Sequence, residues 1–220
     1  MSDIREFIAK NVASLLRNGD VINLGVGIPT LTTQFLPEGV EVFVQAENGI
    51  IGCGPEAMGE EIDRDVIDAG AKYITILPGG WYFDSAISFG IIRGSHLDAT
   101  ILGALQVDEQ GNLANWYVPG KLLPGPGGAM DLVAGAKKVI VAMEHTTKYG
   151  EPKVLRECTL PLTSIGTVTT IVTELTILNR TPQGLELVAL APGETVESVQ
   201  TKTGCALVLP TDGKIGTMIQ

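Results

Sequence analysis

Residues 21–30 read Val21-Ile22-Asn23-Leu24-Gly25-Val26-Gly27-Ile28-Pro29-Thr30, a short apolar run that leads directly into a glycine-rich loop. Further apolar runs of strand length lie at residues 41–45, 73–77, 99–102 and 139–142, and the run at 73–77 is expected to end at Pro78-Gly79-Gly80. Apolar residues at three- and four-residue spacing predict helices at 4–16, from Thr30 to before Pro37, and at 83–92. Strands that alternate with helices favour an α/β fold, with a mostly parallel open sheet and helices on both faces.

The last third of the chain predicts an antiparallel addition to this sheet. Residues 171–178 alternate in polarity as one half-buried strand does, and a turn at 181–184 leads to a second strand at 185–190. These strands form a predicted C-terminal hairpin, with a helix at 194–203 packed behind it. No linker or charge block separates the parts, so residues 1–220 are expected to form a single domain.

The composition excludes several classes of protein. The chain has 220 residues, 45% of them hydrophobic, and a mean hydropathy of +0.26, which excludes intrinsic disorder. Its net charge of −10 disfavours binding to nucleic acids or anionic membranes through bulk charge. The longest uncharged run, residues 21–37, is interrupted by Gly, Pro, Asn and Gln and is not expected to span a membrane.

Cysteine and histidine usage indicates the compartment and the absence of a metal site. The three cysteines lack CxxC spacing, which favours a reducing compartment without a disulfide framework. Two histidines are too few for a histidine-rich metal centre, and the N-terminus lacks the pattern of a signal peptide. We therefore expect a cytoplasmic protein without a bound metal.

Three loops are expected at the carboxyl ends of strands, where open α/β sheets bind ligands. The first, residues 25–30, resembles the start of a dinucleotide-binding fingerprint. Thr30 stands where that fingerprint needs its third glycine, so a general loop of close backbone approach at Gly27 is favoured.

The second loop places Glu47 directly after an apolar strand. Asn48 and Gly49 favour a sharp turn around this carboxylate, because both residue types tolerate positive φ angles. One interpretation is a simple turn with a solvated glutamate. The other is a catalytic carboxylate in a tight apolar turn, where desolvation raises its reactivity.

The third loop, residues 124–131, is rich in glycine and opens a helix near Asp131. Its free backbone N–H groups are suited to an anion, although an ordinary glycine-rich connection explains the composition equally well. Lys121 nearby is suited to a phosphate or to a surface carboxylate. His96, His145 and Cys53 lack partners in the sequence pattern, and we interpret them as structural.

Taken in order, the loops resemble those of a known enzyme family over roughly residues 4 to 178. The motifs are the 25–30 loop, Ala46-Glu47-Asn48-Gly49 with Gly52 and Gly54, Phe83-Asp84-Ser85-Ala86, Ile92-Arg93-Gly94-Ser95-His96-Leu97-Asp98, Leu102-Gly103-Ala104-Leu105-Gln106-Val107-Asp108, Asn115-Trp116-Tyr117-Val118-Pro119-Gly120-Lys121 and Gly127-Gly128-Ala129-Met130-Asp131-Leu132. This order resembles the β (or B) subunits of family I CoA-transferases, which act on 3-oxoacids or on acetate or butyrate with acetoacetate.

The resemblance implies specific roles. The family's nucleophile is the glutamate of its Glu-Asn-Gly motif, which falls on Glu47, so Asn48 and Gly49 belong to the site with it. The family's Gly-Gly-Ala loop falls on Gly127, Gly128 and Ala129 and is expected to donate backbone N–H to an oxyanion, and Gly27 is expected in the binding surface for substrate and CoA.

Two departures from the family pattern bear on the site. Ser95 stands where relatives usually have glycine, and the bulky pair Trp81-Tyr82 blurs the assignment of the acyl pocket.

The expected activity is transfer of CoA between an acyl-CoA (succinyl, acetyl or butyryl) and a short-chain carboxylate such as acetoacetate. It proceeds in ping-pong fashion through a glutamyl-CoA thioester and needs no metal or redox cofactor. The resemblance also implies an α subunit as partner, in an α₂β₂ tetramer. Two alternatives remain open, namely an isomerase-like protein of the same fold that binds sugar phosphates, and an interaction subunit without catalysis.

Overall fold

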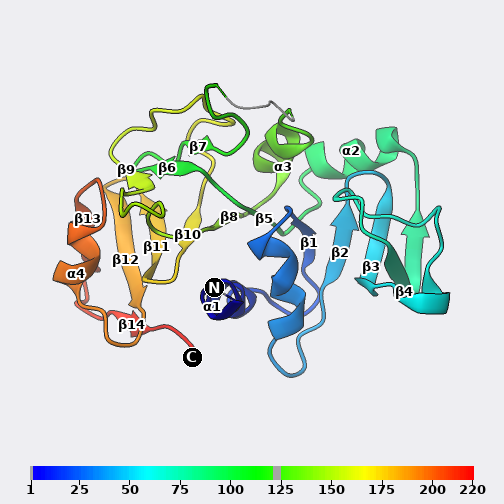
Figure 1. The fold of residues 1–220 in the computed structure, drawn as a ribbon, viewed down its shortest axis with the longest axis horizontal. Helices are drawn as coiled ribbons and strands as arrows, with labels where there is room; N and C mark the ends of the chain where they lie inside the picture. Colours follow the sequence, from blue (N-terminus) through cyan, green and yellow to red (C-terminus); the bar gives the residue numbers. More distant parts are fainter. Residues whose placement is uncertain (1, 121–124) are drawn as a thin grey trace.

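The apolar runs of the chain form the parallel centre of one curved sheet in the computed structural model, which describes residues 2–120 and 125–220 (Figure 1). The central strands, which are parallel to one another, are β2 (Phe43–Ala46), β1 (Val21–Leu24), β5 (Ala99–Leu102), β8 (Val139–Ala142) and β10 (Thr170–Val172) in spatial order. The ranges predicted at 99–102 and 139–142 are confirmed residue for residue as β5 and β8, and the apolar run that begins at Val21 forms β1.

Antiparallel strands extend the sheet on both sides. Beyond β2 lie β3 (Ile50–Glu56) and β4 (Ile74–Tyr82), and beyond β10 lies the predicted C-terminal hairpin of β11 (Thr176–Thr181) and β12 (Gly184–Leu190). Short strands β13 (Leu207–Val208) and β14 (Gly216–Thr217) pair with β12. A small second sheet joins β7 (Leu113–Ala114), β6 (Gln106–Asp108) and β9 (Val154–Leu155).

The strand predicted at 41–45 is β2, which begins two residues later and ends one residue later. Two further predicted strands differ more. β4 does not stop at Pro78 but continues to Tyr82, because Gly80 passes so close to Gly52 of β3 that a Cβ on Gly52 would lie 2.8 Å from the Gly80 Cα. The stretch 171–178 is two strands, since the Thr173 hydroxyl accepts hydrogen bonds from the N–H groups of Leu175 and Thr176 and turns the chain.

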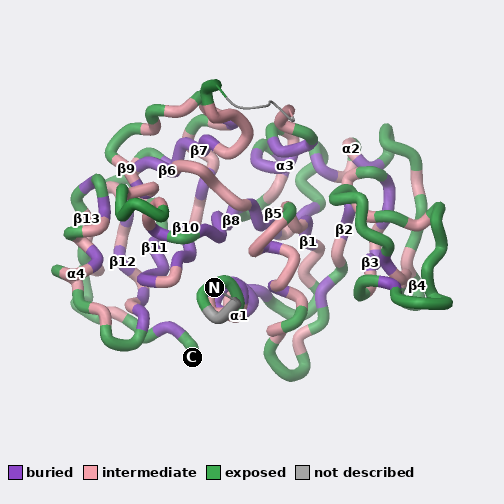
Figure 2. The backbone as a smooth tube through the Cα atoms, viewed as in Figure 1, coloured by how far each residue is buried: buried purple, intermediate pink, exposed green. Residues whose placement is uncertain are grey.

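Helices cover both faces of the sheet, as predicted. On one face α1 (Ser2–Ala13) and the 3₁₀ helix η1 (Ile28–Phe35) pack on Ile22, Ile101 and Ile140, and in Figure 1 the strands curve around α1, which is seen nearly end-on. On the other face α2 (Ser85–Arg93) and α3 (Ala129–Gly135) pack on Val139 and Val141. Alternate residues of a strand therefore feed two cores, which form the buried interior in Figure 2.

Two short helices complete the described residues: η2 (Gly59–Glu61) between β3 and β4, and α4 (Val196–Thr201) behind the hairpin. No helix in residues 2–120 and 125–220 combines the length and apolar character needed to cross a membrane.

His145, just after β8, is fully buried and has a structural role. Its Nδ1 and Nε2 lie 3.0 and 2.9 Å from the hydroxyls of Thr173 and Thr203. Burial, reinforced by the nearby positive charges of Lys202 and Lys153, lowers the His145 pKa from its ordinary 6.5 to about 4. The folded chain therefore holds this imidazole neutral.

This burial predicts a pH dependence of stability. Above about pH 6.5 both states hold His145 neutral, whereas between 6.5 and about 4 only the unfolded state binds the proton. The stabilisation is therefore present above pH 6.5 and is lost as the pH falls to 4, by up to about 3 kcal/mol. Urea unfolding at several pH values should show a smaller loss of stability for His145→Gln than for the wild type. Equal losses would contradict this account.

Candidate functional site

Glu47 lies in a tight turn between β2 and β3, at the carboxyl edge of the parallel strands. The Gly49 N–H donates to the Ala46 carbonyl at 3.0 Å and closes the turn. Gly49 has a φ of +125°, and a Cβ there would collide with the Phe83 carbonyl, so only glycine fits. The Asn48 amide donates to the Ile67 carbonyl at 2.8 Å and ties the turn to the following loop. The predicted sharp turn is therefore present.

The Glu47 carboxylate is held by a buried amide on the neighbouring strand. Asn23 Nδ2 lies 3.0 Å from Glu47 Oε2, and also 3.0 Å from the backbone carbonyl and the side-chain oxygen of Gln45. The Gln45 amide donates in turn to the Ser88 hydroxyl at 2.9 Å. Asn23 and Gln45 are 1% exposed, so this network lies inside the sheet and fixes one carboxylate oxygen.

Sequence reasoning missed Asn23, Gln45 and Ser88. The available signal was a single polar residue inside each of two otherwise apolar strands, Asn23 in β1 and Gln45 in β2. Such a residue is buried on both sides and needs an internal partner.

The glycine-rich loop before α3 meets Glu47 in space. A Cβ on Gly128 would lie 3.3 Å from the Glu47 Cγ and 3.5 Å from its Oε1, so the absence of a side chain lets the loop backbone reach the carboxylate. The Ala129 N–H already donates to the Pro126 carbonyl at 3.2 Å. The Gly128 N–H makes no hydrogen bond to any residue that the structure describes. Lys121 lies outside the described residues.

Gly27 lies in the adjacent loop, after β1. Its φ is +101°, its carbonyl accepts from the Thr30 hydroxyl at 2.8 Å, and η1 begins at the next residue. A Cβ on Gly27 would lie 3.6 Å from Arg5 Nη2 of α1. The direction in which a side chain would point from Gly27 therefore faces a guanidinium from within the chain.

A cavity of about 470 Å³ opens beside Glu47, and we refer to it as the Glu47 cavity. Its charged lining residues are Glu47, Glu56, Asp68 and Lys72, and its apolar lining includes Leu24, Val26, Leu36, Val42, Val44 and Leu77. Cys53 also lines it, but burial, helped by the negative charges of Asp68 and Glu47, raises the Cys53 pKa to about 12. The Cys53 thiol is protonated at neutral pH and is therefore a poor candidate for a nucleophile in this cavity.

The remaining sequence candidates lie at the surface. Trp81 and Tyr82 are 72% and 59% exposed at the end of β4, whereas Ser95 and His96 are exposed after the far end of α2. Ser95 adopts a φ of +59°, which is the left-handed conformation that glycine takes more easily.

The amide network predicts a stability effect at Asn23. Asn23→Leu keeps the volume close but leaves two buried oxygens of Gln45 without their donor, which should lower the free energy of unfolding by about 1–3 kcal/mol. Asn48→Ala, which removes an exposed hydrogen bond, is the control and should lower it by less than about 1 kcal/mol. Urea denaturation measures both, and equal effects would argue against the network.

Comparisons with known proteins place this arrangement among related chains. Residues 5–202 match the model of the family described as coenzyme A transferase. The chain is 49% identical over 201 residues to the beta chain of acetate CoA-transferase from Escherichia coli K12, and the match spans 91% of this chain and 92% of that protein. It is 47% identical over 200 residues to the B-type subunit of succinyl-CoA:3-ketoacid coenzyme A transferase from Helicobacter pylori J99, spanning 91% and 96%.

This chain spans less than half the length of two further similar proteins. The mitochondrial succinyl-CoA:3-ketoacid coenzyme A transferase 2A of Rattus norvegicus is 45% identical over 92% of this chain, which spans only 39% of that protein. Among solved structures, the acyl-CoA transferase YdiF of E. coli O157:H7 has a TM-score of 0.76 at 23% identity, covering 98% of this chain and 43% of its own. Glutaconate coenzyme A-transferase from Acidaminococcus fermentans has a TM-score of 0.69 at 17% identity, covering 98% and 88%. These two structures share the fold.

Proposed function

The chain belongs to the coenzyme A transferase family, and we propose that it moves CoA from an acyl-CoA to a short-chain carboxylate with Glu47 as the nucleophile. Relatives 45–49% identical over most of the chain are CoA-transferase subunits, so this chain is a subunit of such an enzyme. Their names include acetate and succinyl-CoA:3-ketoacid transferases. The proposed donors are acetyl-, succinyl- or butyryl-CoA, and the proposed acceptor is a short-chain carboxylate such as acetoacetate.

The observation that carries the proposal is the meeting of Glu47 with the Gly128 backbone. Asn23 holds Oε2, while Oε1 faces the glycine loop beside the cavity. A carboxylate is suited to this exchange because it forms both an anhydride with an acid and a thioester with CoA. Neither a serine ester nor a cysteine thioester would give the same exchange.

The reaction balances without an external reagent. Glu47 attacks the thioester carbonyl, the C–S bond breaks, and CoA leaves as the thiolate, which gives an acyl-glutamyl anhydride. The thiolate then attacks the glutamyl carbonyl, releases the first carboxylate and forms the glutamyl-CoA thioester. The acceptor carboxylate reverses both steps, so the kinetics are ping-pong. CoA is a substrate here, and the scheme requires no metal or redox cofactor.

Each neighbour of Glu47 has a proposed task in this scheme. Each addition creates an oxyanion, and the Gly128 N–H, which has no partner among the residues that the structure describes, is the proposed donor to it, with Gly127 and Ala129 shaping the loop. Gly49 and Asn48 hold the turn, so the carboxylate needs little reorganisation during attack. Gly27, in the loop before η1, is proposed to let the substrate approach the loop backbone.

We further propose an α subunit as partner, in an α₂β₂ tetramer, because relatives of this length are named as the beta or B member of an enzyme with more than one kind of subunit. The continuous sheet from β13 to β4 supports treating residues 1–220 as one domain. Three free cysteines support a location in the reducing cytoplasm.

The test of Glu47 is covalent trapping. Incubation of the co-expressed α and β subunits with acyl-CoA and no acceptor should leave CoA attached at Glu47, as detected by mass spectrometry. Glu47→Gln keeps the size and an oxygen for Asn23 but cannot form the anhydride, so turnover should fall far more than the ~10²–10⁴-fold typical of a lost general base. Glu56→Gln, the same change in the same cavity, is the matched control and should retain turnover and adduct.

An adduct on another residue, or transfer without any adduct, would remove Glu47 as the nucleophile. Full activity of folded Glu47→Gln would favour the alternative of a subunit without catalysis.

The glycine loop gives a second prediction. Gly128→Val keeps the backbone N–H but would place methyl groups between the loop and Glu47. We therefore expect turnover to fall about 10²–10³-fold, as it does when an oxyanion donor is lost, while the fold is kept. The φ of −81° at Gly128 suits any residue, so backbone strain is not expected. Gly90→Ala, at an exposed glycine of α2 with open space around it, should leave turnover unchanged. Wild-type turnover in Gly128→Val would exclude the loop from the mechanism.

A further inference from the structure

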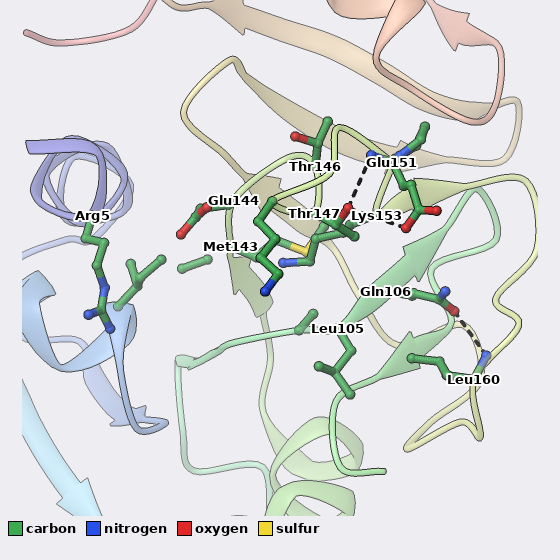
Figure 3. Close-up of a pocket in the computed structure, with 15 residues that line it drawn as sticks. Arg5, Leu105, Gln106, Met143, Glu144, Thr146, Thr147, Glu151, Lys153 and Leu160 are labelled. Carbon is green, nitrogen blue, oxygen red and sulfur yellow. Dashed lines mark hydrogen bonds between the residues drawn. The ribbon is translucent and has the colours of Figure 1, made fainter. Parts of the chain in front are cut away.

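Helix α2 lies beside both halves of the candidate site. Its Ser88 is fully buried and hydrogen-bonds Gln45 of β2. The next residue, Phe89, lies beside the glycine loop, because a Cβ on Gly128 would be 3.5 Å from the Phe89 Cζ. The larger cavity of about 850 Å³ in Figure 3 is lined instead by α1 and by the connections after β5 and β8, and Ser88 does not line it. The proposed chemistry gives Ser88 no task.

A row of buried side chains connects Ser88 to the proposed nucleophile. Gln45 Nε2 donates to the Ser88 hydroxyl at 2.9 Å, and Gln45 Oε1 accepts from Asn23 Nδ2 at 3.0 Å. The same Asn23 nitrogen lies 3.0 Å from Glu47 Oε2. Ser88 is 0% exposed, and Gln45 and Asn23 are 1% exposed. Because water does not reach these three side chains, each of their polar groups depends on a partner inside the protein.

The two amides of this row differ in how many acceptors they have. Asn23 Nδ2 is near three oxygens, namely the Gln45 backbone carbonyl, Gln45 Oε1 and Glu47 Oε2, which is more than its two hydrogens require. Gln45 Nε2 donates only to the Ser88 hydroxyl among the residues that the structure describes. Without that hydroxyl, Gln45 Nε2 would be a buried donor that lacks a partner, which is unfavourable. The Gln45 amide and the Glu47 carboxylate are close neighbours, because both bond the same Asn23 nitrogen.

We propose that Ser88 is a positioning residue for Glu47, because its hydroxyl keeps the Gln45 amide donor turned away from the carboxylate. This inference rests on the proposed function. With Ser88 present, Asn23 is the only described side chain that donates to Glu47, at Oε2, and Oε1 stays available for attack. Without Ser88, the Gln45 N–H turns to the carboxylate, whose negative charge makes it a strong acceptor. That hydrogen bond has to break before Glu47 attacks the acyl-CoA thioester.

The first test is the variant Ser88→Ala, assembled with the α subunit and mixed with acyl-CoA in the absence of an acceptor. Alanine is the best helix former, so α2 should persist. The measurement is the rate constant at which CoA becomes attached at Glu47, followed by rapid quenching and mass spectrometry. We expect this rate constant to fall about tenfold, which is the factor that one hydrogen bond accounts for. The acyl-CoA concentration that gives half the maximal rate should stay unchanged, because a buried residue of α2 does not contact the thioester.

The second test adds Gln45→Met to Ser88→Ala and separates positioning from a loss of packing. The added change keeps the length of the side chain at residue 45 and removes the donor that has lost its partner. Asn23 Nδ2 then retains two acceptors for its two hydrogens, the backbone carbonyl of residue 45 and Glu47 Oε2. We therefore expect the double variant to regain most of the rate that Ser88→Ala loses. A merely structural role predicts instead that the two substitutions lower the rate further together.

Ser164→Ala is the matched control, because the Ser164 hydroxyl also bonds another side chain, Thr167 at 2.7 Å, but belongs to a different part of the fold. It should leave the rate of attachment unchanged. A wild-type rate in Ser88→Ala, the same loss in Ser164→Ala, or no recovery in the double variant would overturn the role of Ser88 while leaving Glu47 as the nucleophile. If the wild type itself forms no adduct at Glu47, the proposed function fails and this inference fails with it.

Discussion

The hydrogen bond from Asn23 Nδ2 to Glu47 Oε2 joins the interior of the sheet to the edge where the proposed chemistry takes place. It depends on β1 and β2 being parallel neighbours in a register that sets Asn23 beside Gln45. Because Asn23 is buried, its amide has few alternative partners. The hydrogen bond therefore holds the Glu47 carboxylate in a fixed position relative to the sheet. A loop glutamate thereby becomes a fixed group, and the other loops are arranged around it.

Most of the parallel centre of the fold was accessible from the sequence because its strands are short apolar runs, and β1 and β5 are followed directly by glycine. β1, β5 and β8 are buried on both faces, so composition alone defines them. The strands at the margins were less accessible. β4 passes through Pro78 and Gly79 because of a contact with β3. Thr173 divides the stretch after β8 by a local hydrogen bond. Neither contact leaves a periodic pattern of apolar residues in the sequence.

For the candidate site, sequence reasoning proposed Glu47 and Gly128 because both belong to glycine-rich loops at strand ends, and the fold brings these two residues close together. Their proximity depends on the tertiary structure, because the packing of α2 and α3 on the sheet sets it. Asn23 was missed because one amide in an apolar strand carries no spacing signal.

The course of β4 also governs how the sheet ends. β4 is the last strand on its side among the described residues, and such an edge normally offers a row of free N–H and C=O groups to any passing strand. Pro78 removes one donor, and Gly79, with a φ of +85°, breaks the extended line. Pro78 and Gly79, which made the strand hard to predict, thus disfavour edge-to-edge aggregation at this side of the sheet. Trp81 and Tyr82 lie exposed beside them.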